Sequence, residues 1–189
     1  LITDKTGTLT EGKPSVEKVV ALEGDSNDLL QQIASLNQYS EHPLAQAVVN
    51  YAKKKKTTLT KVDDFEAVAG MGVTGTVAGT KVALGNKKLM EKIMASVSKE
   101  LETQILAEQK LGKTVSYISI GNKALGLVSI TDAIKKTSIA AVKTLMDQGV
   151  EVIMLTGDNE NTAKAVADEL HVTNFKAGFL PEDKLAFIK

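Results

Sequence analysis

The sequence predicts an α/β fold in which a doubly wound parallel sheet is interrupted by an inserted α+β module built on an antiparallel sheet. From residue 132 onward, strand-like and helix-like segments alternate, which is typical of parallel sheets with helices on their faces. Residues 65–84 instead contain four valines separated by glycines, a pattern that indicates short strands and tight turns. Residues 1–3, Leu-Ile-Thr, run into a small, polar, glycine-containing stretch, as expected where a strand of the first sheet ends.

Hydrophobic spacing predicts the elements of the inserted module in order. Residues 16–22 alternate as a strand does, and residues 28–38 carry apolar side chains at helical spacing. Pro43 stands where the first turn of a helix tolerates proline, so we expect a helix over 44–53. The other elements expected in the module are β structure over 65–84, helices over 87–94 and 98–110, and a hairpin of strands 115–120 and 124–130.

The first domain resumes after the hairpin. Residues 1–3 and 151–155 are expected to be buried strands of its sheet. Its other expected elements are helices over 134–146 and 162–170, a short strand near 174–177 and a last helix that starts at Pro181. The predicted domains are therefore a discontinuous one over 1–14 and 127–189, and an inserted one over 15–126.

Composition narrows the functional class. The 189 residues are 43% hydrophobic, and 23 basic side chains balance 23 acidic ones, so the chain lacks the basic excess of a nucleic-acid-binding surface. No cysteine is present, which excludes disulfides and thiolate metal sites. No apolar run approaches the length of a membrane span. Because the sequence lacks an initiating Met, we expect an internal segment of a longer protein.

The stretch Asp4-Lys5-Thr6-Gly7-Thr8-Leu9-Thr10 is the most informative part of the sequence. Asp4 stands where a strand of an open α/β sheet ends, which is where such sheets place reactive groups. A carboxylate there can attack a phosphoryl group and carry it as an acyl phosphate. Lys5 adds positive charge, and the amides of the Thr-Gly-Thr turn can face phosphate oxygens.

A second candidate phosphate-binding turn is Thr156-Gly157-Asp158, which follows the apolar strand 152–155 and precedes a helix. Lys184, in Leu-Pro-Glu-Asp-Lys, can offset charge on transferring oxygens. Asp132 precedes the helix expected from residue 134, so its position is that of an N-cap of that helix, which is compatible with a further role.

Together these motifs resemble the phosphorylation domain of P-type ATPases, which has a haloacid-dehalogenase-like fold. The resemblance implies that Asp4 becomes phosphorylated, that Lys5, Thr6, Thr156, Gly157, Asp158 and Lys184 assist, and that Asp132 is a hinge. It also implies that Mg²⁺ is held by Asp4 and the Thr6 carbonyl. Related phosphatases carry an acidic residue two positions after the nucleophile, where this chain has Thr6. Thr6 cannot act as a general acid or base, so the acyl phosphate should persist.

The inserted domain resembles the nucleotide-binding domain of heavy-metal P-type ATPases, which carries the sequence SEHPLA found here at 40–45. The resemblance implies a set of residues that bind ATP: Asn37, Glu41, His42, Gly70, Gly72 and Asn86. Asn37 departs from the family, which usually has a glutamate there. Residues 107–114 also match a loose P-loop pattern, but a helix precedes and a strand follows, so Gly112 is better explained as a helix C-cap.

The implied function is the ATP-binding and phosphorylation unit of a heavy-metal cation pump, with Cu(I) export expected and Zn, Cd or Co transport as the alternative. ATP and Mg²⁺ are the implied cofactors. The implied partners are the transmembrane and actuator domains of the parent chain and a metallochaperone, with no nucleic acid. The implied location is the cytoplasmic face of a membrane, most simply the plasma membrane.

The family's Gly-Asp-Gly-x-Asn-Asp segment is absent, so we expect the phosphorylation domain to be truncated at its C-terminal side and the chain to show weak ATP turnover at most. A soluble dehalogenase-type phosphatase, a purely nucleotide-binding module and a potassium-type ATPase are further alternatives.

Overall fold

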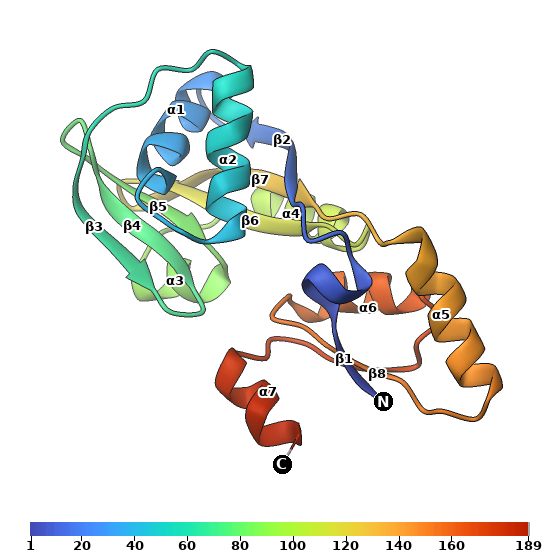
Figure 1. Ribbon diagram of the computed structural model, residues 1–189. Coiled ribbons are helices and arrows are strands. Elements are labelled where there is room, and N and C mark those ends of the chain that lie inside the picture. The colour runs from blue at the N-terminus through green and yellow to red at the C-terminus, as the bar shows by residue number, and fades with distance from the viewer. Residues whose placement is uncertain (189) are drawn as a thin grey trace. The chain divides into compact units, whose positions relative to one another are not determined.

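The computed structural model describes residues 1–188, which form two compact units (Figure 1). Unit 1 comprises Leu1–Pro14, Glu108–Thr114 and the residues from Thr131 onward, whereas unit 2 comprises Ser15–Ala107 and Val115–Ile130. Each unit buries its own hydrophobic clusters. Nothing in the described part of the chain is a helix long and apolar enough to cross a membrane.

Unit 1 is built on a three-stranded parallel sheet of order β1-β8-β9. Its strands are β1 (Ile2–Asp4), β8 (Ile153–Leu155) and β9 (Asn174–Lys176). Its helices are α5 (Lys136–Asp147), α6 (Glu160–Glu169) and α7 (Pro181–Ile188). The parallel sheet predicted from the alternation of strands and helices is confirmed. The fully buried members of its core include Met154, Ala163 and Ala167.

The expectation that residues 1–3 are a buried strand is wrong in one respect. Ile2 and Thr3 do lie in β1, but Leu1 precedes that strand and is 59% exposed, and Ile2 is 36% exposed. The reason is that β1 lies at the edge of the sheet, where among the described strands it pairs only with β8. An apolar run alone cannot distinguish an edge strand from a central one.

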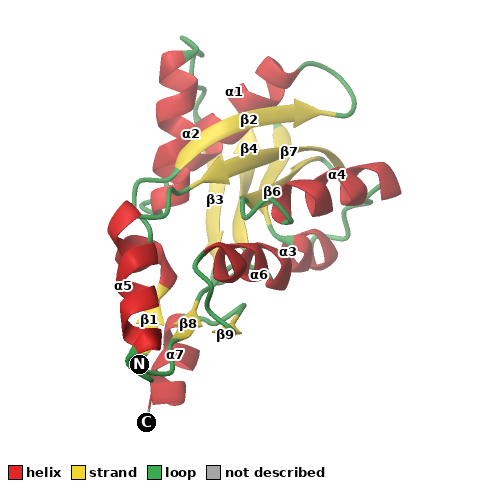
Figure 2. Cartoon of the chain, turned by 90° about the vertical axis from the view of Figure 1, so that its right-hand side faces the viewer, coloured by secondary structure: helices red, strands yellow, loops and turns green. Residues whose placement is uncertain are grey.

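Unit 2 is a six-stranded sheet of order β2-β7-β6-β5-β4-β3, with helices on both faces (Figure 2). Its strands are β2 (Ser15–Ala21), β3 (Val62–Val68), β4 (Gly72–Val77), β5 (Thr80–Gly85), β6 (Thr114–Ile120) and β7 (Lys123–Thr131). Its helices are α1 (Ser26–Asn37), α2 (Pro43–Lys54), α3 (Lys87–Lys92) and α4 (Lys99–Gln109). The antiparallel pairing of β3 to β6 follows the prediction for residues 65–84 and 115–120.

Alternation along the strands of unit 2 explains why both faces are covered. In β5, Val82 and Leu84 pack into the cluster that contains α1 and α2, whereas Ala83 packs into the cluster that contains α3 and α4. β6 divides in the same way, with Ile118 in the first cluster and Tyr117 in the second. Successive side chains of a strand point to opposite faces of the sheet. Since consecutive residues of these strands are apolar, both faces of the sheet must be covered.

The compact units differ from the predicted domains in two places. Residues 108–114 lie in unit 1, although the predicted inserted domain runs unbroken from 15 to 126. Unit 1 resumes at Thr131 rather than at 127, because β7 continues to that residue as a strand of the sheet of unit 2. The predicted range 127–189 also ends at Lys189, which lies outside the described residues.

Candidate active site

Asp4 ends β1 and lies directly beside the end of β8. The parallel register pairs Asp4 with Leu155, so the next residue along β8, Thr156, emerges at the same edge of the sheet. A short irregular helical turn, Lys5–Leu9, follows Asp4 and contains two non-helical residues, Thr6 and Gly7. Gly7 has φ +76°, a left-handed conformation that glycine adopts without strain. The first two predicted phosphate-binding turns therefore both begin at the carboxyl ends of the parallel strands, one after β1 and one after β8.

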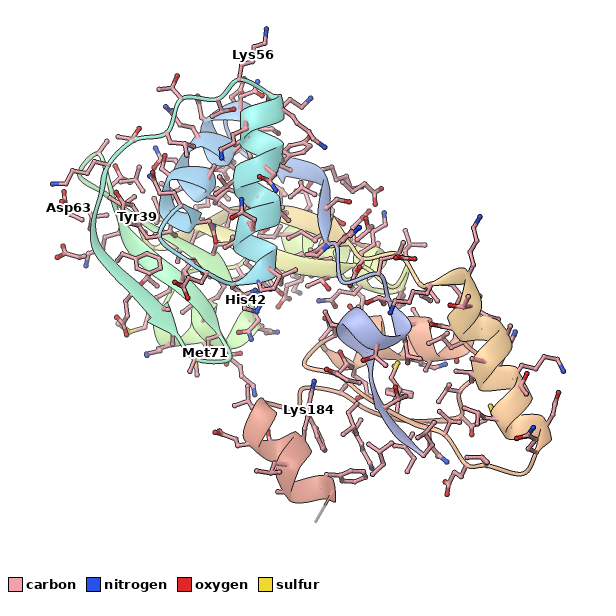
Figure 3. All side chains as sticks on the ribbon, in the orientation of Figure 1. Tyr39, His42, Lys56, Asp63, Met71 and Lys184 are labelled. Carbon is pink, nitrogen blue, oxygen red and sulfur yellow. The ribbon has the colours of Figure 1, made fainter. Side chains whose placement is uncertain are left out.

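Figure 3 shows the Lys184 side chain on α7, and this side chain contacts the carboxylate of Asp4. Its Nζ donates to Asp4 Oδ1 at 2.6 Å, and the backbone amide of Lys5 donates to the same oxygen at 2.9 Å. The Lys184 and Asp4 side chains are 25% and 45% exposed, so this ion pair is open to solvent. The third predicted motif is thus next to the first.

Lys5 makes a more deeply buried contact. Its Nζ lies 2.7 Å from Asp158 Oδ2, and the two side chains are only 6% and 11% exposed. The Thr156 hydroxyl donates to the same carboxylate oxygen at 3.1 Å and accepts from the Asp158 amide at 3.1 Å. The Thr114 hydroxyl donates to the other oxygen, Oδ1, at 3.1 Å. Asp158 therefore neutralises Lys5, while two hydroxyls hold its carboxylate.

The loop after Asp4 is braced from the other side by residues 132–135. Thr10 is fully buried, and its hydroxyl donates to Asp132 Oδ2 at 2.6 Å while accepting from the Gly7 amide at 3.1 Å. Asp132 Oδ1 accepts from the Lys13 amide at 3.1 Å, and Lys135 Nζ donates to the Gly7 carbonyl at 2.9 Å. These contacts fix the turn that contains the candidate phosphate-binding amides.

Asp132 is not the N-cap of α5, which corrects one of the two alternatives predicted for it. The N-cap position is Lys135, with no side-chain capping bond, because Asp132 is already engaged with Thr10 and Lys13. Its assignment as a hinge stays a prediction. Gly157, in turn, has no steric need to be glycine, since an added Cβ would only reach ordinary contact, 3.5 Å from a carbonyl oxygen.

In unit 2, the residues predicted to bind nucleotide form two groups. The first lies between α1 and α2. His42 is the exposed N-cap of α2, and its Nδ1 accepts from the Leu44 amide at 3.2 Å, which leaves Nε2 as the ring nitrogen available to a ligand. Glu41 is also exposed. Asn37 is only 3% exposed, and its Nδ2 donates to the Ile33 carbonyl at 2.7 Å.

The second group lies at the turn between β3 and β4 and at the start of α3. Asn86 caps α3 by accepting from the Leu89 amide at 3.1 Å, and its Nδ2 donates to the Gly70 carbonyl at 2.8 Å. Gly72 has φ +145°, and a Cβ there would meet the Leu84 carbonyl oxygen at 2.2 Å. Both residues thus have structural roles besides the predicted one. Figure 3 shows His42 and Met71, the latter between the two glycines, at the same end of unit 2.

Two hollows lie in unit 1 rather than beside these nucleotide candidates. One, of about 300 Å³, is lined by one face of α5, by Leu1 and Thr3 at the start of the chain, and by residues that include Thr8 and Lys135. The other, of about 420 Å³, is lined by residues 177–179 and by Asp183, Ala186 and Phe187 of α7. Among the described residues, no group of three or more acidic or histidine side chains is arranged to hold a metal ion.

Three contacts at the site were not predicted from the sequence: those of Thr10, Thr114 and Lys135. Thr10 is the last residue of the motif that begins with Asp4, which was a signal that its side chain matters. Thr114 lies 44 residues from Asp158, and no local pattern indicates a contact over that distance.

Comparisons with known proteins give matches over the whole chain. The whole chain, residues 1–189, matches the haloacid dehalogenase-like hydrolase family. It is 40% identical over 188 residues to a copper-exporting P-type ATPase of Staphylococcus aureus (strain JH9), which covers 100% of this chain and 23% of that protein. The chain therefore spans less than a quarter of the length of the curated relatives it matches.

Several solved structures are similar over 99% of the chain, and two of them represent different ATPases. One is a zinc-transporting PIB-type ATPase, with a TM-score of 0.66, 32% sequence identity and 30% of that chain covered. The other is the catalytic domain of a CPx-ATPase studied for its conformational changes on nucleotide binding, with a TM-score of 0.74, 27% identity and 64% covered. From the match over its full length and the site at the end of β1, the chain belongs to the haloacid dehalogenase-like hydrolases.

Proposed function

We propose that this chain is the ATP-binding and phosphorylation unit of an ATP-driven heavy-metal pump, and that Asp4 is the residue phosphorylated. The observation that carries the proposal is the environment of Asp4, a carboxylate at a strand end with Lys184 on one of its oxygens and the buried pair of Lys5 and Asp158 beside it. A 40% identity to a copper-exporting P-type ATPase supports it.

In the proposed reaction, Asp4 attacks the γ-phosphorus of ATP. A bond forms between the carboxylate oxygen and phosphorus, the bond from phosphorus to the bridging oxygen breaks, and ADP leaves with that bonding pair. Asp4 Oδ2 is suited to the attack, because the hydrogen bonds recorded to this carboxylate from described residues both go to Oδ1. Lys184 and the amides of the loop around Gly7 then face the charge on the transferring oxygens.

Thr6 supports an acyl phosphate that persists. It stands two positions after the nucleophile, where an acidic side chain could activate water, and its hydroxyl cannot serve as a general base near neutral pH. A soluble phosphatase of the same family would need that step to be fast. This single position therefore favours a pump over a phosphatase.

The donor set at Asp4 fits Mg²⁺. Magnesium prefers hard oxygen ligands and is commonly held by one or two carboxylates together with substrate phosphates. The Asp4 carboxylate and the Thr6 carbonyl are the groups of this chain that we propose would hold the metal, which would neutralise charge on the phosphoryl oxygens. Asp4 is 45% exposed, which leaves room for water and phosphate ligands.

The proposed nucleotide site lies in unit 2, with His42 as its central residue. The exposed imidazole, with Nε2 unused by the helix cap, can stack on or hydrogen-bond to a purine base. Glu41, Gly70 and Gly72 are proposed neighbours of the nucleotide. Asn37 and Asn86 stay in the proposal with a reduced part, since Asn37 is buried and the Asn86 amide already bonds at both ends.

Cu(I) export is the transport activity we propose, with zinc, cadmium or cobalt as the alternative. The copper-exporting relative is 40% identical and the zinc-transporting one 32% identical, so both are near. As parts of the same proposal, the unit works at the cytoplasmic face of a membrane with the transmembrane and actuator domains of a longer chain, and a metallochaperone supplies that protein with metal.

A calorimetric or NMR titration of this chain with ATP tests the nucleotide site. His42→Ala removes a helix cap as well as the imidazole, so His42→Asn is the better variant, because asparagine still caps a helix. We expect saturable binding that weakens in both variants. Binding that both variants retain in full would remove His42 from the site.

Acid-stable labelling from [γ-³²P]ATP in the longer protein tests the phosphorylation. Asp4→Asn should abolish the label and leave nucleotide binding intact. Hydrolysis of small phosphate esters by the chain, without any acid-stable label, would instead favour the soluble phosphatase.

A further inference from the structure

The segment Glu108–Thr114 packs into unit 1 although it connects α4 and β6 of unit 2. The Thr162 hydroxyl, which is fully buried, donates to the Lys113 carbonyl at 2.7 Å. Gly112 turns the chain with φ +78°, and a Cβ there would lie 3.5 Å from Val166. The start of α6 therefore holds the backbone of this segment in one place, immediately before Thr114.

Thr114 uses that placement to contact Asp158. Its hydroxyl donates to Asp158 Oδ1 at 3.1 Å, on the opposite oxygen from the one that takes Lys5 and Thr156. A carboxylate held at one oxygen alone can rotate about its last bond. With a donor on each oxygen, the plane of the Asp158 carboxylate is fixed, and so is the oxygen that faces Lys5.

We propose that Thr114 is a positioning residue for the phosphorylation of Asp4, acting through Asp158 and Lys5. This inference rests on the proposed function, because it assigns Thr114 a part in that reaction. The connection consists of three steps: the bond from Thr114 to Asp158, the ion pair of Asp158 with Lys5, and the peptide bond from Lys5 to Asp4. Small displacements of a group that orients reactants cost large factors in rate.

Residues 107–114 match a loose P-loop pattern but do not form a P-loop. A P-loop needs a strand before the loop and a helix after it, whereas here α4 precedes and β6 follows. In the proposed role, the Thr114 hydroxyl donates a hydrogen bond to a protein carboxylate. In a P-loop, the corresponding hydroxyl instead coordinates a metal bound to the nucleotide.

The test compares the rate of aspartyl-phosphate formation at saturating ATP in the longer protein that carries this chain. Thr114→Val keeps the shape and the strand preference of the side chain and removes only the hydroxyl, whereas Thr114→Ser restores it. We expect Thr114→Val to slow phosphorylation roughly tenfold, the scale of a lost hydrogen bond to a charged group. Thr114→Ser should recover most of the rate.

The matched control is Thr144→Val, in which another threonine of unit 1 loses a hydroxyl that donates within α5, to the Ala140 carbonyl at 2.9 Å. It should phosphorylate at the unchanged rate. The dissociation constant of ATP should also be unchanged in Thr114→Val, since a role in positioning lowers the rate of transfer without loosening the nucleotide.

Three results separate the inference from the proposed function. No label in the unsubstituted protein overturns the proposed function itself. Normal labelling in which Thr114→Val is as fast as the unsubstituted protein overturns the role of Thr114 alone. If Thr114→Val is slow and Thr114→Ser is equally slow, the hydroxyl is not the group responsible, and the role of Thr114 is overturned. The role is also overturned if the affinity of Thr114→Val for ATP falls by the same factor as its phosphorylation rate, because the effect would then lie in nucleotide binding.

Discussion

The substitution Asp158→Asn should destabilise unit 1 strongly, because Asp158 is the partner of the buried Lys5 ammonium. The Lys5 and Asp158 side chains are 6% and 11% exposed, and their charged atoms lie 2.7 Å apart. Removing one partner of a buried pair costs about 3–5 kcal/mol, since the other charge stays out of water without compensation. The asparagine oxygen can still accept a hydrogen bond, so we expect the lower end, about 3 kcal/mol.

The matched control is Asp168→Asn, which makes the same chemical change in the same unit. Asp168 pairs with Lys164 at 2.8 Å on α6, but the two side chains are 65% and 63% exposed. An exposed pair four residues apart on a helix is worth about 0.3–0.5 kcal/mol. The two variants make the same substitution, in one case at a buried ion pair and in the other at an exposed one.

The assay is unfolding in urea, monitored by the hydrogen exchange of backbone amides. The amides of β8 report on the unfolding of unit 1, and the amides of β5 report on the unfolding of unit 2. Separate probes are needed because a chain with two compact units need not unfold in one step. Asp158→Asn should lower the unfolding free energy at β8 and leave β5 unchanged. If its cost equals that of Asp168→Asn, the pair is not an energetic anchor and the reasoning fails. The double variant Lys5→Met with Asp158→Leu should regain most of the loss, because it removes both charges.

Three further predictions concern single contacts. Gly72→Ala should destabilise unit 2 by about 2–4 kcal/mol in urea unfolding, because a Cβ meets the β5 backbone at φ +145°; Gly121→Ala, at φ +62° in open space, should cost about 1 kcal/mol, and equal costs would contradict the clash. Thr10→Val should lower the stability of unit 1 by about 1.5–3 kcal/mol in the same assay, since it leaves the Asp132 carboxylate without its 2.6 Å donor, and an unchanged stability would contradict this. Burial raises the pKa of the Tyr117 hydroxyl above its ordinary 10.0, so the native state keeps this proton where the unfolded chain loses it; the unfolding free energy should fall as pH rises from 10 through the native pKa, and Tyr117→Phe should flatten that fall, whereas an identical slope would show no linkage.

Local pattern was sufficient for most of the elements, because each carried its own periodicity. The helix predicted over 44–53 is α2, Pro43–Lys54, and that over 98–110 is α4, Lys99–Gln109. The helix predicted over 28–38 begins two residues earlier, at Ser26, because Asp25 caps it by accepting from the Asn27 amide. That aspartate was a visible start signal.

Contacts between distant segments were beyond reach of the sequence alone. Nothing local indicates that residues 108–114 pack on α6, or that β1 lies at a sheet edge with Ile2 exposed. Asp132 shows the same limit, because an aspartate before a helix predicts a cap, while its actual partner, Thr10, lies 122 residues away. The motifs named the side chains that lie near the ends of β1 and β8, and the topology determines which of them touch.

The two lysines beside Asp4 differ in how easily they can be released, and this difference fits the proposed reaction. Lys5 is held in a buried pair, so moving it leaves a charge uncompensated at a cost of several kcal/mol. Lys184 meets Asp4 in a pair that is 25% and 45% exposed, and pairs open to water are commonly worth about 1 kcal/mol or less. An incoming phosphoryl group can therefore take Lys184 from Asp4 at little cost, while Lys5 keeps its place. In the proposed reaction, Lys5 is the fixed cation that defines the geometry of the site, and Lys184 is the exchangeable cation that follows the charge as it moves onto the phosphoryl oxygens.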